Sequence, residues 1–187
     1  MYLKKLFFSS LLSLGMLHAQ NSIGLNINSD DLEVLAAMNL NAFADYSDST
    51  TYIIDGSYLH TDGDNLSTIG LSGENTFQGV QGLALAFGAK LIFADSFFAV
   101  PLFGKASYAL PFNDSIPTTS IVTSIAYAPS VLSFSDAESY TEFRLEADME
   151  VISNIHLFTG YRNIDTEYDR YDKTFNSSFY GGMKLSF

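Results

Sequence analysis

The fold is decided by residues 143–151, which read Phe143-Arg144-Leu145-Glu146-Ala147-Asp148-Met149-Glu150-Val151. Five apolar residues alternate with four charged residues without exception. A strand places successive side chains on opposite faces, so all four charges share one face, whereas a helix at this spacing would scatter them. A tilted strand of roughly nine residues is also long enough to cross a bilayer. The segment therefore predicts a strand with one apolar and one charged face.

The same period of two recurs along the rest of the chain. Between Leu83 and Phe93, for example, the large residues occupy the odd positions. Ten such segments are predicted, at residues 22–28, 32–43, 51–60, 66–76, 80–93, 97–110, 118–132, 140–152, 155–167 and 176–187. A sheet in lipid must have no unpaired edge, so an even number of antiparallel strands should close on itself. We therefore expect one all-β domain over residues 20–187. It would be a closed antiparallel up-and-down transmembrane β-barrel of about ten strands, with eight as the alternative.

Two other folds share part of this pattern. A soluble sandwich or a lipocalin-like barrel has the same period, but here the continuous face is the apolar one. Aromatic residues also gather near the predicted strand ends, as the girdles of a membrane barrel require; they are Tyr52, Tyr58, Phe93, Phe98, Tyr108, Tyr127 and Tyr161. A helical hairpin over residues 82–110 would be interrupted by Lys90, Asp95, Pro101 and Lys105. The membrane barrel is the interpretation that these features favour.

The N-terminus has the pattern of an export signal. Lys4 and Lys5 precede the apolar stretch 6–17, and Leu17-His18-Ala19 forms a cleavage site between Ala19 and Gln20. An uncleaved membrane anchor is the alternative, although a spanning helix needs about 20 apolar residues. We therefore predict a signal peptide over residues 1–19.

The C-terminus has the pattern of an insertion signal for outer-membrane barrels. Phe179, Met183, Leu185 and Phe187 share one face of an alternating strand that ends on an aromatic residue. The predicted signal consists of Tyr180, Gly182, Leu185 and Phe187, and it would be recognised by the barrel-assembly machinery. Together the two ends predict a location in a bacterial outer membrane.

Composition excludes several other functions. The chain has no cysteine, which excludes disulfides, thiolate metal sites, a cysteine nucleophile and an N-terminal lipid anchor. Its formal charge is −12, and it becomes −14 when Lys4 and Lys5 leave with the signal peptide. Such a surface cannot bind nucleic acid through phosphate contacts.

Several stretches make the chain resemble the YfaZ family of small outer-membrane proteins. They are Ser22-Ile23-Gly24-Leu25, the segment 56–64, Gly88-Ala89-Lys90, the segment 158–165 with its Gly160-Tyr161-Arg162, and the terminal Ser186-Phe187. The resemblance covers nearly all of the chain after residue 19. It implies a barrel in the outer membrane of a Gram-negative cell, and it implies neither an enzymatic role nor any known functional residue.

The inward face should hold a set of charged side chains. Six acids and five bases are predicted there: Glu33, Asp55, Glu74, Lys90, Lys105, Arg144, Glu146, Asp148, Glu150, Arg162 and Lys184. The interior of a ten-stranded barrel is little wider than its side chains. We expect an internal salt-bridge network that closes the lumen and leaves a structural or interaction role, with a narrow porin-like channel as the alternative. One predicted pair is Glu146 opposite Arg162, across a turn at residues 153–155 that places Ile152 opposite His156.

Catalysis and metal binding have little support. His60 precedes Asp62 and Asp64, which is the one arrangement that suggests an outer-membrane hydrolase or acyltransferase. The alternation of faces along its strand, however, places His60 on the lipid side together with Tyr58. The turn Asp62-Gly63-Asp64-Asn65 lacks further ligands at calcium-loop spacing. We predict no enzyme, metal or cofactor. The expected partners are membrane lipid and lipopolysaccharide, the latter at the acidic stretch 165–173, and the protein should be a monomer.

An even strand number returns the chain to its starting side. Both termini and the turn Ser153-Asn154 should then be periplasmic, and the loops near Gly63, Ser135 and Asp169 extracellular.

Overall fold

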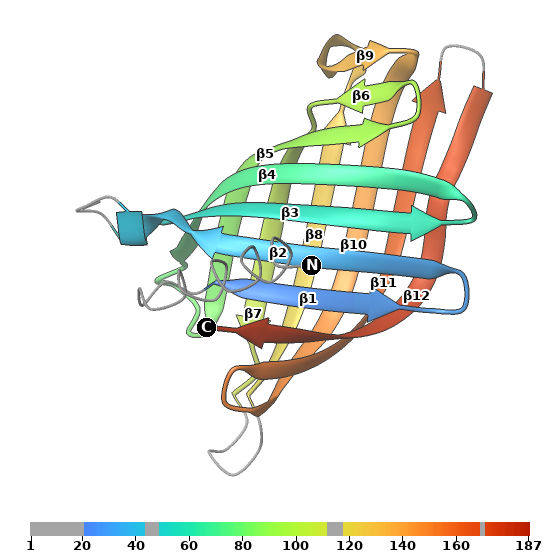
Figure 1. Ribbon diagram of the computed structural model, residues 1–187. Helices are drawn as coiled ribbons and strands as arrows, with labels where there is room; N and C mark the ends of the chain where they lie inside the picture. Colours follow the sequence, from blue (N-terminus) through green and yellow to red (C-terminus); the bar gives the residue numbers. More distant parts are fainter. Residues whose placement is uncertain (1–20, 44–48, 112–117, 169–170) are drawn as a thin grey trace, which may run out of the picture.

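The computed structural model describes residues 21–43, 49–111, 118–168 and 171–187 of the chain. Within them, ten long strands form one closed antiparallel barrel (Figure 1). The strands are β1 (Ser22–Ile27), β2 (Asp31–Asn39), β3 (Thr51–Thr61), β4 (Asp64–Thr76), β5 (Leu83–Ala94), β7 (Leu102–Ala109), β8 (Thr119–Ala128), β10 (Ala137–Ile152), β11 (Ile155–Tyr168) and β12 (Tyr171–Ser186). Each pairs with its neighbours in chain order, and β1 pairs with β12 to close the ring.

The predicted closed barrel of ten antiparallel strands is confirmed, and each predicted segment overlaps one of these strands, with ends that differ by up to five residues at the start of β12. The alternatives of eight strands and of a helical hairpin are wrong, since residues 83–94 form β5. Segment 97–110 is divided at Val100-Pro101 into a short strand β6 (Phe97–Ala99) and β7. Segment 118–132 ends early because Pro129 leads into the 3₁₀ turn η3 (Ser130–Leu132). A second 3₁₀ turn, η2 (Leu40–Phe43), follows β2. No described helix has the length and hydrophobicity needed to span a membrane.

The barrel has two distinct ends. Asn21 and Phe187 exchange two backbone hydrogen bonds, of 3.1 and 2.9 Å, at the end that we call the terminal end. The turn Ser153-Asn154 lies there too, since the Ser186 amide donates to the Asn154 carbonyl at 2.8 Å. The turn Asp62-Gly63 lies at the opposite, distal end, where Asp62 and Gly63 both have positive φ. Both described chain ends therefore lie at one end of the barrel, as predicted; Asp169 falls outside the described residues.

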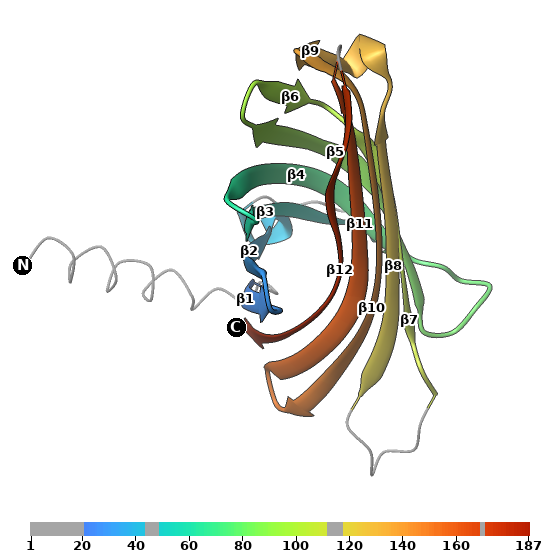
Figure 2. The same ribbon diagram turned by 90° about the vertical axis from the view of Figure 1, so that its right-hand side faces the viewer.

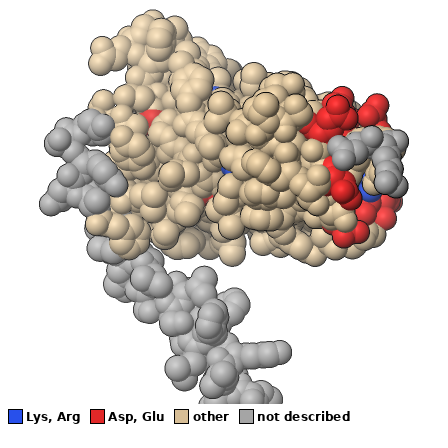
Figure 3. Space-filling view, turned by 90° about the horizontal axis from the view of Figure 1, so that it is seen from above, with Lys and Arg blue, Asp and Glu red and all other residues tan. Residues whose placement is uncertain are grey.

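The wall has an apolar outer face. Large side chains that point outward are exposed, including Phe87 at 67% and Phe179 at 77%, whereas the inward Ala86 and Tyr180 are 0% and 3% exposed. Figure 3 shows a surface that is largely free of charge, with acidic side chains gathered near one end. This alternation is the arrangement that the sequence period predicts.

The interior lies between two curved walls. Strands β1–β4 face β8, β10 and β11 across it (Figure 2). Towards the distal end the inward side chains pack into one apolar cluster, which consists of Leu59, Leu66, Ile92, Phe97, Ala99, Phe103, Ala126, Ala128, Ala137, Tyr140, Ile164, Tyr168 and Phe175. The short strand β9 (Ser133–Ser135) pairs with β6, which brings Phe97 over this cluster at 5.2 Å, ring to ring, from Tyr168.

Candidate functional site

The centre of the interior is an ion-pair network that joins opposite walls. Glu33 on β2 and Arg144 on β10 are separated by three strands of the ring, β1, β12 and β11. The Arg144 guanidinium nevertheless donates two hydrogen bonds to the Glu33 carboxylate, at 2.9 and 2.8 Å. Such a bidentate pair is among the strong and directional contacts in proteins. The network therefore spans the lumen rather than lining one wall.

Arg162 binds the same carboxylate from β11. One of its terminal nitrogens lies 2.6 Å from Glu33, the other lies 3.3 Å from Asp31, and its Nε donates to Asn176 at 2.9 Å. The side chains of Arg162 and Glu33 have no solvent exposure. Asn26 adds a fourth hydrogen bond to Glu33, at 2.8 Å. A buried charge is tolerated only when it is paired and hydrogen-bonded, and both ions meet that condition.

The network continues from β10 to β5 through Glu142. This carboxylate accepts a hydrogen bond from Arg144 Nε at 2.5 Å and one from Lys90 of β5 at 3.1 Å. The Tyr140 hydroxyl also donates to it at 3.1 Å, which joins the network to the apolar cluster above. We call Asp31, Glu33, Lys90, Glu142, Arg144 and Arg162 the central network.

All eleven charges predicted for the lumen belong to inward positions of their strands. Besides those in the central network, Lys105 pairs with Glu74 at 3.0 Å, and Lys184 pairs with Asp148 at 2.5 Å. Glu146 accepts a hydrogen bond from the Tyr180 hydroxyl at 3.1 Å, and Glu150 accepts one from the Asn154 amide at 3.0 Å.

The predicted pairing of Glu146 with Arg162 is wrong. Glu146 lies opposite Gly160, and Arg162 lies opposite Arg144. The turn contains Ser153 and Asn154 alone, and an irregularity between Glu150 and Ile152 shifts the register, so that Ile152 faces Ile155 rather than His156. A β-bulge places two residues of one strand opposite one of its partner, so it changes which residues pair beyond it.

Two members of the central network were missed in the sequence. Glu142 is an even-numbered residue of its strand and points inward like Arg144, so parity alone could have found it. It lies just before the regular stretch that begins at Phe143. Asp31 was missed because the strand was predicted to start at residue 32, whereas β2 starts at Asp31.

The predicted C-terminal signal has two faces. Leu185 and Phe187 are exposed on the outer wall, while Tyr180 and Gly182 point inward. Gly182 lies opposite Phe158, and a Cβ at this position would come within 2.5 Å of the Phe158 ring. Only glycine allows the ring to lie against the wall there.

A polar cavity of about 570 Å³ lies on the terminal side of the central network. It extends from Asn154 and Ser186 at the terminal end to Lys90. Its lining includes Asp55, Glu74, Lys105, Glu150, His156 and Lys184, together with four serines. We call this cavity the vestibule. His156 is held at its edge by Asp148, with Nδ1 2.7 Å from the carboxylate.

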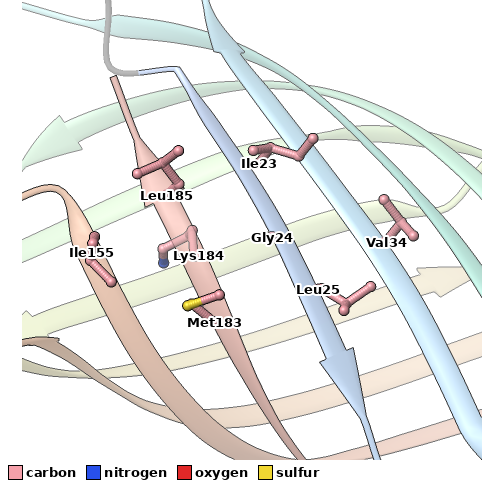
Figure 4. Close-up of a pocket in the computed structure, with 8 residues that line it drawn as sticks. All are labelled: Ile23, Gly24, Leu25, Val34, Ile155, Met183, Lys184 and Leu185. Carbon is pink, nitrogen blue, oxygen red and sulfur yellow. The ribbon is translucent and has the colours of Figure 1, made fainter.

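A second hollow lies on the outer wall over the seam between β1 and β12 (Figure 4). It measures about 430 Å³, and its lining includes Ile23, Leu25, Val34, Met183 and Leu185. Gly24 lines the hollow with its backbone alone, since a Cβ there would point inward, 3.5 Å from Lys184 Cβ. It is an apolar depression in the surface that would face lipid.

The weak catalytic and metal candidates remain isolated. His60 is exposed on the outer face, and its Nδ1 lies 2.8 Å from Asn65 rather than on a carboxylate. Asp64 pairs with Lys173. In the described residues, no group of three His, Asp or Glu side chains could hold a metal ion.

Comparison with known proteins agrees with the fold. A solved structure titled "Bacterial polysaccharide outer membrane secretin" superposes with a TM-score of 0.50 at 11% identity, over 89% of this chain and 69% of that one. A structure titled as a NanC porin gives 0.46 at 9% identity, over 90% and 98%. At 11% identity the likeness to the secretin structure concerns the fold alone. A search of the curated proteins finds no match. The family model described as "YfaZ precursor", however, matches residues 3–187. The chain therefore belongs to the YfaZ family.

Proposed function

We propose that this protein is an outer-membrane β-barrel whose lumen is closed, and that it has a structural or interaction role rather than a transport role. The apolar outer face supports the membrane setting, because a barrel without free edges is the form in which strands cross a bilayer. Its exposed apolar side chains are far too many for a soluble surface.

The observation that carries the closed lumen is the double binding of Glu33. Its carboxylate holds Arg144 and Arg162, so one side chain of β2 bridges to β10 and β11 through the centre of the barrel. The apolar cluster adds a second closure on the distal side, since Leu59, Ile92 and Tyr140 are almost without exposure. An ion would have to break these pairs and cross the apolar cluster.

Single-channel recording of the refolded full-length protein in a planar bilayer tests this proposal. We expect no steady conductance from the wild type at moderate voltage, with a general porin as the positive control. Refolding should be verified first by circular dichroism and by the heat-dependent mobility shift typical of barrels. Regular conductance steps from verified wild-type barrel would contradict the closed lumen.

A narrow channel is the second candidate. It is favoured by the vestibule, which extends from the terminal end as far as Lys90. If the central network opens, this cavity would form half of a pathway for ions or small solutes. The same recordings distinguish the two candidates.

The location and partners form part of the proposal. Cleavage between Ala19 and Gln20 would remove the signal peptide, which agrees with the description of the family as a precursor. Mass spectrometry of the outer-membrane fraction should then find Gln20 at the mature N-terminus. The assembly machinery would recognise the strand that carries Tyr180, Gly182, Leu185 and Phe187. Exposed acids at the distal end, such as Asp30 and Asp62, would lie near lipopolysaccharide and its bridging divalent cations.

A further inference from the structure

We infer that the vestibule binds a small zwitterion of the amino-acid type, whose ammonium group lies on Asp55. This inference goes beyond the proposed function and does not require a closed lumen. It rests on the volume of the cavity, on one carboxylate without a partner and on the lysine donors around it.

Asp55 is the charged group of the vestibule that lacks a partner. Among the described residues it makes no hydrogen bond and no ion pair, although it lines the cavity. The nearby bases attract the Asp55 carboxylate but form their ion pairs with other acids: Lys90 binds Glu142, and Lys105 binds Glu74. A partly buried carboxylate without a partner is costly, and a cationic ligand would offset that cost.

The position of the Asp55 carboxylate depends on the residue opposite. Asp55 on β3 pairs with Gly70 on β4. A Cβ on Gly70 would lie 2.7 Å from Asp55 Oδ1 and 2.8 Å from Oδ2, so the carboxylate occupies space that any other residue would fill. The sequence thus provides room for an acid at this point of the wall.

The rest of the lining favours a negative group on the same ligand. Lys90, Lys105 and Lys184 all border the cavity, and each donates to one carboxylate in the structure. An ammonium group has three donors, so each lysine has donors left for an incoming carboxylate. The same lysines would repel a ligand that carries only positive charge. Ser22, Ser72, Ser124 and Ser186 add hydroxyl groups, and a cavity of about 570 Å³ is within the range of small-molecule sites.

Isothermal titration of the refolded full-length barrel in detergent tests this inference. The probes are three zwitterions of increasing length, glycine, 4-aminobutyrate and 6-aminohexanoate, together with butylamine and butyrate as half-ligands. We expect at least one zwitterion to bind at least about tenfold more tightly than either half-ligand. Butylamine lacks the carboxylate and butyrate lacks the ammonium group, so each loses the hydrogen bonds of one charged group.

Variants then locate the ammonium group. Asp55→Asn should weaken binding of the zwitterion at least about tenfold. Gly70→Ala should weaken binding of the zwitterion as well. The added methyl group would displace the Asp55 carboxylate, while Asp55 keeps its charge. Asp62→Asn, at an exposed turn of the distal end, is the matched control and should leave binding unchanged.

Three results would overturn the inference: no zwitterion binds the wild type, butyrate binds as well as the best zwitterion, or a folded Asp55→Asn retains wild-type affinity. None of them affects the conductance of the wild type, so failure of this inference is distinguishable from failure of the closed lumen.

Discussion

Arg144 and Arg162 are direct cross-strand partners, and both guanidinium groups bind the carboxylate of Glu33. Like charges at directly opposed positions of a sheet destabilise it. The two arginines remain paired because an acid from the far side of the barrel lies between them. The stability of the β10–β11 hairpin therefore depends on a residue of β2.

Replacing Glu33 with Gln should destabilise the barrel strongly. The substitution retains shape but leaves two buried guanidinium groups undercompensated, and loss of one partner from a buried ion pair costs about 3–5 kcal/mol. Urea unfolding of refolded protein, followed by the mobility shift, measures the change. Glu138→Gln, at an exposed position, is the control and should have little effect. Equal stability of the two variants would show that Glu33 is not the centre of the network.

Gly182→Ala should lower the melting temperature of the barrel. The added methyl group would meet the Phe158 ring at 2.5 Å and the Leu25 carbonyl at 2.4 Å, and overpacking of this kind costs about 1–3 kcal/mol. Gly181→Ala is a close control, because a Cβ there meets only the Phe158 carbonyl at 3.8 Å. If both variants have the melting temperature of the wild type, the Phe158 ring does not lie against the wall at Gly182.

Phe187 has two separable roles. Its backbone exchanges two hydrogen bonds with Asn21 across the closing seam, whereas its side chain lies on the outer wall. Deleting Phe187 should reduce both refolding in vitro and assembly in cells. Phe187→Ala retains the backbone bonds, so it should refold normally but assemble poorly if the aromatic group is part of the insertion signal. Western blots of outer-membrane fractions and refolding yields provide the two measurements. Normal assembly of the deletion variant would exclude the signal.

The proposed orientation can be read from single cysteines, since the chain has none. Asp30→Cys at the distal β1–β2 turn and Ser153→Cys at the terminal end are both exposed positions. With a membrane-impermeant maleimide on intact cells, we expect labelling at residue 30 and none at residue 153. Lysed cells should label at both positions, which serves as the control. The reverse pattern on intact cells would invert the barrel.

Periodicity was enough to predict the strands and the face that each residue occupies. Alternation such as that of residues 143–151 is a local property. The predicted face of a residue therefore stays correct even where the predicted strand ends or turns are wrong. The register of the β10–β11 hairpin was not predictable in this way. It depends on a two-residue turn with Asn154 at φ +71°, which the pair Ser153-Asn154 does signal, and on an irregularity next to Glu150, which no pattern in the sequence marks.

Contacts across the lumen could not be predicted from local sequence pattern either. Parity places Glu33 and Arg144 inside the barrel, but their contact depends on how a closed ring brings β2 opposite β10. The apolar cluster was missed for a related reason. Leu59, Leu66 and Ile92 occupy the face that elsewhere carries small or charged residues, and only the completed barrel brings them together.

The bonds of Glu33 also bear on the time that the barrel stays folded. They join residues 111 and 129 positions apart in the chain, so they can form only when the first and last thirds of the chain meet. Contacts between residues so far apart in the chain form late in folding, because closing the loop between them costs entropy before the contact can stabilise the fold. Interactions that are absent from the transition state slow unfolding rather than accelerate folding. We therefore expect the ions at the centre of this barrel to act mainly on its lifetime, by slowing its unfolding after the seam between β1 and β12 has closed.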